Sequence, residues 1–128
     1  MIAGTQSRGM LLGGAVAVEL GVGFAEIRKD TKAQAKADGP GLDLLRRSTP
    51  PDYAERDLIL TLRRGVVRPR DRVLLVDDWI VTGAQARTAR TLVEDAEASW
   101  LGVAAIVDDA DAHTRRDLNL RALLRIMT

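Results

Sequence analysis

The first quarter of the chain contains three apolar segments, which predict a strand, a helix and a second strand. Residues 1–4 are apolar and predict the end of a buried strand. Residues 8–20 are mostly apolar and predict a buried helix, with Gly21 at the position where a left-handed backbone commonly ends a helix. Residues 22–27 then predict a short buried strand.

A long polar segment over residues 28–52 interrupts this pattern. Gly39-Pro40-Gly41 and Pro50-Pro51 break any regular element there. A connection of this length inside a small domain is usually functional or disordered. We therefore expect a flexible loop at about residues 29–52.

The second half of the chain returns to strands and helices. Leu58, Leu60 and Leu62 alternate with other neighbours as in a half-exposed strand, and the unbroken apolar run at 73–76 is typical of a central parallel strand. Apolar positions on one face predict a helix over 83–96, which precedes a strand at 100–107 and a final strand near 122–126. Strands alternating with helices predict a single α/β domain with an open parallel sheet.

Composition narrows the classes of function. The 128 residues carry 19 basic and 18 acidic side chains, and a net charge of +1 gives no field that would recruit nucleic acid or a membrane surface. The absence of cysteine excludes thiolate nucleophiles and cysteine-bound zinc, and it fits a cytoplasmic location. The apolar run at 10–20 carries Glu19 and is too short to span a bilayer.

An acidic doublet followed by a turn of small residues carries the candidate chemistry. Asp77 and Asp78 come directly after the strand at 73–76, where ligands bind in open α/β sheets, and two adjacent carboxylates can accept hydrogen bonds from two sugar hydroxyls. The N–H groups of residues 82–86 at a helix start favour a phosphate. The pattern indicates a phosphorylated sugar, and the alternative is a solvated strand end followed by a helix cap.

The run from Val73 to Gln85 resembles the phosphoribosyl-pyrophosphate motif of the type I phosphoribosyltransferases. The resemblance implies a Rossmann-like parallel sheet flanked by helices. It also implies that Asp77 and Asp78 bind the ribose 2- and 3-hydroxyls. The 5-phosphate would then be bound by Thr82, Gly83, Ala84, Gln85 and Ala86.

Two upstream segments extend the resemblance toward the adenine branch of that family. Gln6-Ser7-Arg8-Gly9 and the helix after it are similar to the pyrophosphate loop and first helix, which implies that Ser7, Arg8 and Gly9 bind the leaving pyrophosphate. Arg28, Lys29 and Lys32 are similar to the start of the flexible catalytic loop. Arg8, Lys29 and Lys32 are thus the expected catalytic cations, the alternatives being a helix-capping or solvated Arg8 and a surface charge cluster.

The chain also departs from the adenine branch. Lys32-Ala33-Gln34 replaces the usual Leu-Pro-Gly stretch, Tyr53 is a shifted candidate for a family tyrosine, and Arg70 stands where glycine is frequent. Family members carry further helices and a strand before the position of Met1, which form much of the hood over the base. We therefore expect this chain to lack the hood, the alternative being that its start was assigned late.

The resemblance implies phosphoribosyl transfer from 5-phosphoribosyl-1-pyrophosphate to a purine base, with adenine favoured, in a homodimer. Magnesium would be bound mainly through the substrate, with Asp77 and Asp78 as indirect partners and no direct protein ligand. Two alternatives remain open. One is a non-catalytic regulatory module that binds the same sugar pyrophosphate. The other is a receiver-type phosphoacceptor domain, which fits worse because its acidic pair lies on the first strand.

Several further residues have plain interpretations. His113 is the only histidine and is expected on the surface. Trp79 follows the doublet and either forms a wall of the base site or packs in the core. Trp100 is expected to be structural. Asp108 and Asp109 are expected as a solvated strand end, the alternative being that they orient magnesium-bound water.

Overall fold

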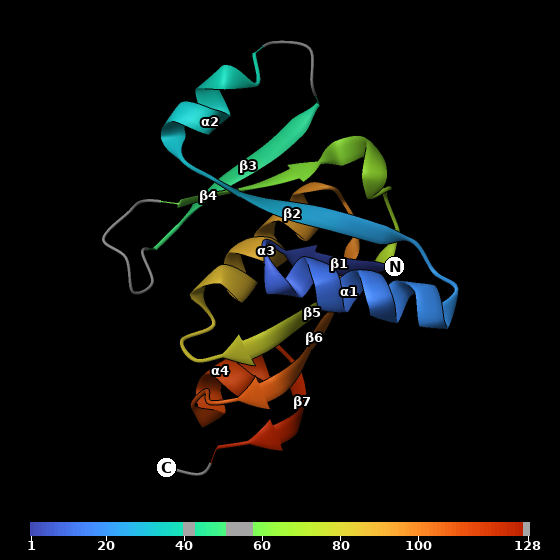
Figure 1. The fold of residues 1–128 in the computed structure, drawn as a ribbon, viewed down its shortest axis with the longest axis vertical. Helices are drawn as coiled ribbons and strands as arrows, with labels where there is room; N and C mark the ends of the chain where they lie inside the picture. The colour runs from blue at the N-terminus through green and yellow to red at the C-terminus, as the bar shows by residue number, and fades with distance from the viewer. Residues whose placement is uncertain (40–42, 51–57, 127–128) are drawn as a thin grey trace.

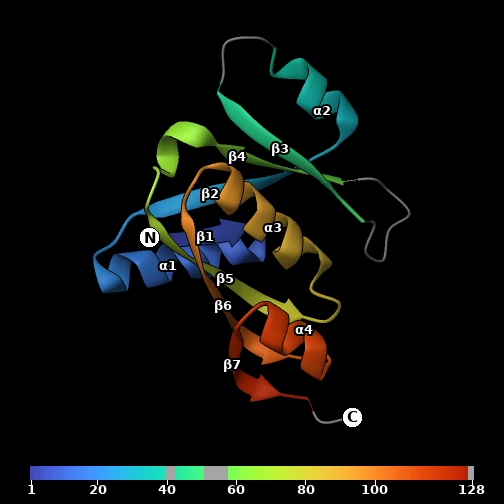
Figure 2. The ribbon, with the colours of Figure 1, turned by 180° about the vertical axis from the view of Figure 1, so that it is seen from behind.

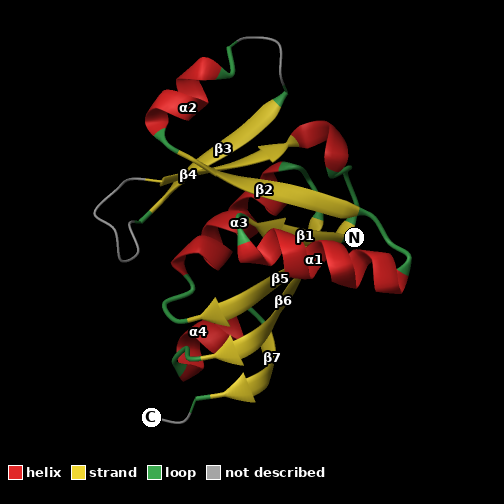
Figure 3. Cartoon of the chain, viewed as in Figure 1, coloured by secondary structure: helices red, strands yellow, loops and turns green. Residues whose placement is uncertain are grey.

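The computed structural model describes residues 1–39, 43–50 and 58–126 and shows a seven-stranded sheet with helices on both faces (Figures 1 and 3). The first half contains β1 (Ile2–Thr5), α1 (Arg8–Leu20), β2 (Phe24–Asp30), α2 (Lys32–Ala37), β3 (Leu44–Thr49) and β4 (Leu58–Arg63). A short 3-10 helix (Arg64–Val66), β5 (Arg72–Ile80), α3 (Ala84–Asp95), β6 (Ser99–Asp108), α4 (Ala112–Asp117) and β7 (Leu120–Arg125) follow.

The strand order is β3-β4-β2-β1-β5-β6-β7. The five strands from β2 to β7 in this order pair in parallel, as the alternation of strands and helices predicts. At one edge, β4 runs antiparallel to β2, and β3 runs antiparallel to β4. The sheet is therefore mixed, and its parallel part matches the expected α/β class.

Two apolar clusters lie on opposite faces of the sheet. Figure 1 shows α1 in front of the sheet, and Figure 2 shows α3 and α4 on the other side. The face under α3 holds the larger cluster, in which Val73 and Leu75 of β5 pack with Leu92 and Val93 of α3, all with 0% exposure. Alternate residues of a strand point to opposite faces, so an uninterrupted apolar β5 fills both layers.

Close packing of α1 on β1 fixes where the helix begins. A Cβ atom on Gly4 would lie 2.3 Å from the Gly9 carbonyl oxygen, and one on Gly13 would lie 2.9 Å from Cε2 of Phe24. Only glycine permits this approach. It places residues 7–9 directly beyond the carboxyl end of β1. The helix ends as expected, with Gly21 in the left-handed region at φ 65°.

The expected loop at 29–52 is wrong for the part of it that the structure describes. β2 continues to Asp30, and α2 and β3 follow. Thr31 caps α2 by accepting a hydrogen bond from the Gln34 N–H, while the Gln34 side chain accepts one from the Thr31 N–H. Local capping thus builds a short helix in a segment that composition alone marks as irregular. Residues 40–42 and 51–57, including Tyr53, lie outside the described residues.

Strand β5 is longer than its apolar run. Its pairing with β6 continues to Ile80 and Asp108, whereas its pairing with β1 stops at Gly4 and Val76. Asp77 and Asp78 therefore lie within β5, in the part that extends past the end of β1. The last strand begins at Leu120, slightly earlier than expected.

No helix in the described ranges combines the length and apolar character needed to cross a bilayer.

Candidate functional site

A cavity of about 480 Å³ opens where β1, β2 and β5 reach their carboxyl ends. This is the edge at which open α/β sheets bind ligands. Four segments of the chain meet there: the loop after β1, the end of β2, the end of β5 with the turn after it, and the residue that follows β6. The expected site residues that line it are Ser7, Arg8, Lys29, Asp77, Asp78, Trp79, Thr82, Gly83, Ala84, Gln85 and Ala86.

Gln6 attaches the first loop to β2. Its backbone N–H donates to the Ile27 carbonyl at 3.0 Å, and its side-chain oxygen accepts from the Lys29 N–H at 2.9 Å. The bond from Gln6 to Ser7 is a cis peptide. Gln6 itself lines the cavity, although no separate role is expected for it from the sequence. These contacts bring Lys29 and the Ser7-Arg8 segment to the same side of the cavity.

Gly9 lies behind the cavity wall instead of lining it. A Cβ atom at this position would lie 3.1 Å from Oδ1 of Asp77 and 3.2 Å from Oγ1 of Thr5. A larger residue would press on the Asp77 carboxylate. The structure therefore gives Gly9 a spacing role beneath the expected site.

The carboxylate of Asp77 is half-buried between β5 and the start of α1. Burial raises its pKa to about 6, and the neighbouring Asp78 carboxylate adds to the rise. The Asp78 N–H, which donates to Oδ1 of Asp77 at 2.9 Å, and the charge of Lys29 act in the opposite direction. A hydrogen-bond donor or a cation that enters the cavity would therefore stabilise the ionised form of Asp77.

The Asp78 side chain is more accessible and already has two partners. Its Oδ2 lies 2.6 Å from Nε of Arg8, and its Oδ1 accepts from the Trp79 N–H at 2.8 Å. The Arg8 side chain is 79% exposed. An ion pair this exposed contributes little to stability, so a ligand can replace it.

The turn between β5 and α3 supplies backbone donors. Oγ1 of Thr82 accepts from the Ala84 N–H at 3.2 Å, and Gly83 adopts a left-handed conformation with φ 74°. The start of α3 is formed by residues that line the cavity, and the backbone N–H groups at a helix start point toward its N-terminal end. This arrangement suits an anion at the start of α3.

The structure does not bring Arg28 or Lys32 to the cavity. The Arg28 guanidinium donates to Asp30 at 2.9 Å and to Asp38 at 2.7 Å, and it joins β2 to the end of α2. Lys32 opens α2 and is not a lining residue. Among the expected cations of this segment, Lys29 alone lines the cavity.

Four lining residues are not among the expected substrate-binding residues. Gln6 belongs to the loop after β1, Ile80 and Val81 complete the strand end, and Asp109 follows β6. The Asp109 N–H donates to the Ile80 carbonyl at 2.8 Å, which brings Asp109 beside the end of β5. Its place at the end of the next strand indicates this only as an alternative, in which it orients magnesium-bound water, and no signal singles out Ile80 or Val81.

The expectation of a solvated strand end is wrong for Asp108. Its residue is 1% exposed, and its carboxylate pairs with Arg115 and Arg125 and accepts from the Ala110 N–H at 3.0 Å. Despite desolvation, these partners hold its pKa below the usual value. Asp108 is therefore structural.

The two tryptophans differ in environment. Trp79 is 49% exposed and lines the cavity, so it is not a core residue. Trp100 packs against the main core and its indole N–H donates to the Leu118 carbonyl at 3.4 Å, which confirms a structural role. His113 is exposed, as expected.

Carboxylates in the cavity come from Asp77, Asp78 and Asp109. In the part of the chain that the structure describes, no group of three or more histidine or acidic side chains is arranged to hold a metal ion.

Comparison with known proteins finds relatives named adenine phosphoribosyltransferase. No family model matches the chain. A curated adenine phosphoribosyltransferase from Francisella philomiragia subsp. philomiragia is 32% identical over 98% of this chain and 68% of its own length.

Solved structures agree in fold and in name. The adenine phosphoribosyltransferase of Saccharomyces cerevisiae, in complex with an imino-altritol bisphosphate and adenine, has a TM-score of 0.77 and 30% identity over 96% of this chain and 66% of its own. The enzyme of Trypanosoma brucei, in complex with AMP, pyrophosphate and ribose 5-phosphate, has a TM-score of 0.72 and 30% identity. The match covers 97% of this chain and 55% of the T. brucei chain.

This chain spans between 55% and 68% of the length of these three relatives. Its fold agrees with the relationship that the sequence identities show. The chain belongs to the type I phosphoribosyltransferase family, among relatives named adenine phosphoribosyltransferase.

Proposed function

We propose that this protein transfers the phosphoribosyl group of 5-phosphoribosyl-1-pyrophosphate to a purine base, adenine, and releases pyrophosphate. The observation that carries the proposal is one cavity lined by the acidic doublet, the N-terminal turn of α3 and the Ser7-Arg8 segment. The T. brucei structure, with AMP, pyrophosphate and ribose 5-phosphate, supports these ligands for a relative.

Each part of the substrate has a matching part of the cavity. The ribose 2- and 3-hydroxyls would donate to Asp77 and Asp78, and the 5-phosphate would accept from the N–H groups of residues 82–86. The pyrophosphate would lie near Ser7, Arg8 and Lys29. This orientation places the anomeric carbon between the carboxylates and the cations.

The charges of the cavity suit the breaking of the glycosidic bond. The bond from the anomeric carbon to the pyrophosphate oxygen breaks as the base nitrogen attacks from the opposite face, and the proton that this nitrogen loses passes to solvent. Positive charge then develops on the ribose near Asp77 and Asp78, and negative charge develops on pyrophosphate near Arg8 and Lys29. Charged groups fixed beforehand at these positions stabilise the transition state.

Trp79 is the candidate wall for the base. Its half-exposed indole lines the cavity directly after the doublet. A flat aromatic surface next to the ribose site can stack on a purine ring.

Magnesium belongs to the same proposal. A hard cation prefers oxygen ligands and keeps several waters, and the donors in the cavity are the carboxylates of Asp77, Asp78 and Asp109. This donor set fits an ion bound chiefly by substrate oxygens, with the doublet contacting it through water or the ribose hydroxyls. When bound, the ion would supply neutralising charge to the pyrophosphate.

A homodimer and a cytoplasmic location complete the proposal. Leu11 and Val18 lie two turns apart on α1 with 77% and 83% exposure, and association would bury such a surface. Sedimentation at micromolar concentration should give twice the mass of the chain, and a monomer at every concentration would contradict the dimer. A chain without cysteine fits a reducing compartment.

The test is AMP formation from adenine, 5-phosphoribosyl-1-pyrophosphate and magnesium, with calorimetric binding of the sugar pyrophosphate measured in parallel. Turnover supports the proposal. Faster turnover with guanine or hypoxanthine than with adenine would show that the proposed base is wrong. Binding without turnover would indicate the regulatory module instead. Failure to bind would contradict the assignment of the cavity.

A further inference from the structure

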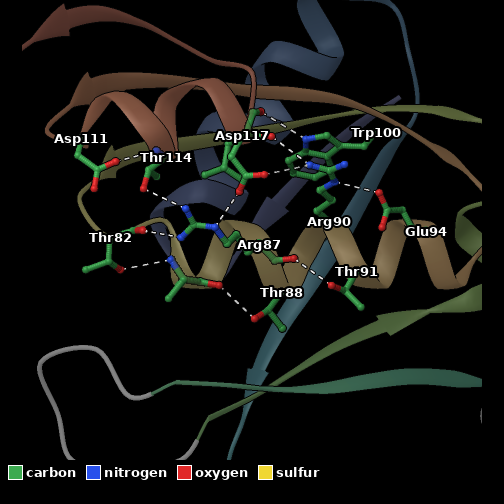
Figure 4. A network of polar contacts seen from close by, with 12 residues as sticks. Thr82, Arg87, Thr88, Arg90, Thr91, Glu94, Trp100, Asp111, Thr114 and Asp117 are labelled. Atoms are coloured by element: carbon green, nitrogen blue, oxygen red, sulfur yellow. Dashed lines mark hydrogen bonds and ion pairs between the residues drawn. The ribbon is translucent and has the colours of Figure 1, made fainter.

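Arg87 connects the turn at residues 82–86 to the helix beside it (Figure 4). Its Nη1 donates to the Thr82 carbonyl at 2.9 Å, and its Nη2 donates to Oγ1 of Thr114 at 3.0 Å. Its Nε donates to Oδ2 of Asp117 at 2.9 Å. All three nitrogens of one guanidinium are therefore engaged, one on the turn and two on α4.

Arg87 does not line the cavity, although the five residues before it do. Its positive charge is paired with Asp117, which limits any direct effect of that charge on a ligand. Arg87 can therefore act on the cavity through the position of the Thr82 carbonyl and of the N–H groups that follow it.

Helix α4 also contacts the turn by packing. A Cβ atom on Gly83 would lie 2.7 Å from Cγ2 of Thr114 and 2.8 Å from Cδ1 of Leu118. Thr114 thus meets the turn with its methyl group and meets Arg87 with its hydroxyl. At 4% exposure it has little room to move.

Helix α4 is itself held in place by several contacts. Its first turn is capped by Asp111, whose Oδ1 accepts from the Thr114 N–H at 2.7 Å. At its other end, Arg90 donates to the Asp117 carbonyl at 3.0 Å and Trp100 donates to the Leu118 carbonyl at 3.4 Å. These contacts make α4 a fixed support behind the turn.

We infer that Arg87, Thr114 and Asp117 hold the turn at 82–86 in the conformation that binds an anion, with Arg87 as a positioning residue. A turn with a left-handed glycine has conformational freedom that a ligand would otherwise have to restrict, at a cost in affinity. The inference rests on the proposed function in one respect, which is that the anion is the 5-phosphate of a ribose.

The matched pair of variants is R87M and R47M. Arg47 also pairs with α3, through Asp95 at the far end of that helix at 2.8 Å, and within the described residues it neither lines the cavity nor bonds to α4. Calorimetry with ribose 5-phosphate should show affinity about tenfold weaker for R87M, since a charged hydrogen bond that orders the donors is lost. R47M should remain within about twofold of the wild type.

Binding of pyrophosphate alone distinguishes a local effect on the turn from general damage to the fold, because general damage would weaken pyrophosphate binding as well. It would bind beside Ser7 and Arg8, away from the turn. R87M should therefore bind pyrophosphate as the wild type does. An equal loss for pyrophosphate and for ribose 5-phosphate would overturn the inference.

Thr114 gives a second test if R87M does not fold. T114V keeps the branched shape but removes the acceptor of Nη2, whereas T114S keeps the acceptor. T114V should weaken ribose 5-phosphate binding several-fold, and T114S should bind nearly as the wild type does. Equal affinities for all three proteins would overturn the inference.

The wild type separates this inference from the function it rests on. If the wild type fails to bind ribose 5-phosphate, the proposed function is contradicted and the inference with it. If the wild type binds and R87M binds equally well, the positioning role alone is wrong.

Discussion

Nε of Arg8 lies 2.6 Å from Oδ2 of Asp78. The proposed function assigns these two residues to different parts of one substrate, the pyrophosphate and a ribose hydroxyl. In the structure, which holds no ligand, the two side chains form an ion pair with each other. Because the pair is exposed, replacing it with contacts to a substrate costs little.

This relationship predicts opposite effects of R8M on two ligands. Affinity for 5-phosphoribosyl-1-pyrophosphate should fall about tenfold, because a charged hydrogen bond to the pyrophosphate is lost. Affinity for ribose 5-phosphate, which has no pyrophosphate, should be unchanged or higher, because Asp78 no longer has to leave Arg8. Titration calorimetry measures both.

A suitable control is R64M, since Arg64 forms an exposed pair with Asp43 at 3.1 Å and is not a cavity residue. R64M should leave both affinities unchanged. A parallel loss of both ligands in R8M would contradict the division of roles between Arg8 and Asp78.

The raised pKa of Asp77 predicts a conflict between stability and binding. Because its pKa is about 6 when folded and 3.8 ordinarily, Asp77 favours the folded state at low pH, and this contribution disappears as pH rises through about 6. D77N removes the buried charge. At pH 8 it should be more stable than the wild type by about 1 to 3 kcal/mol, while its affinity for ribose 5-phosphate falls.

Urea unfolding at pH 8 and at pH 4 measures the stability difference between D77N and the wild type. The advantage of D77N should shrink at pH 4, where Asp77 is protonated in the folded wild type. An advantage that is equal at both pH values, or absent at pH 8, would show that burial does not perturb Asp77.

Lys29 should hold the pKa of Asp77 below the value that burial alone would give, since its charge acts on that carboxylate. K29M should therefore raise the pKa of Asp77 above about 6. A carbon-13 NMR titration of the Asp77 carboxyl group follows this directly. A lower or unchanged pKa in K29M would place the lysine too far away to act on pyrophosphate beside the doublet.

Replacement of two glycines by alanine should change the free energy of unfolding in opposite directions. At Gly83, φ is 74° and a Cβ atom would lie 2.7 Å from Thr114, so G83A should lose about 1 to 3 kcal/mol of unfolding free energy. At Gly14, within α1, a Cβ atom would meet nothing within 4 Å. G14A should gain about 0.5 to 1 kcal/mol, because alanine favours a helix interior.

Denaturant unfolding of both variants provides the measurement. The G14A protein serves as the control for the substitution itself. If G83A is as stable as the wild type, then α4 does not pack against the turn as the structure has it.

The site was predictable from the sequence where its residues are adjacent in the chain. Asp77, Asp78 and residues 82–86 occupy one strand, turn and helix start, so their meeting in one cavity needs no long-range information. Asp109 reaches the same cavity only because β6 pairs with β5 and its N–H bonds to Ile80. The sequence indicates this position of Asp109 only as an alternative, because strand order is not evident from a single sequence.

The prediction of a loop at residues 29–52 is wrong for a related reason. Arg28, Asp38 and Arg46 look like scattered surface charges in the sequence, but they form ion pairs that join β2, α2 and β3. Both arginines donate to Oδ2 of Asp38, at 2.7 Å and 2.6 Å. The polar composition of the segment does not show which of these charges pair with one another. It therefore indicates a loop, and it leaves Arg28 looking available to the substrate.

The most direct test of the account is the affinity of ribose 5-phosphate for the double variant D77N/D78N relative to the wild type. If the doublet and the turn at 82–86 hold one phosphorylated ribose, the wild type binds. The double variant should then lose a hundredfold or more, since two charged hydrogen bonds of roughly 1.5–3 kcal/mol each are weakened. Equal affinities in the two proteins would contradict the account.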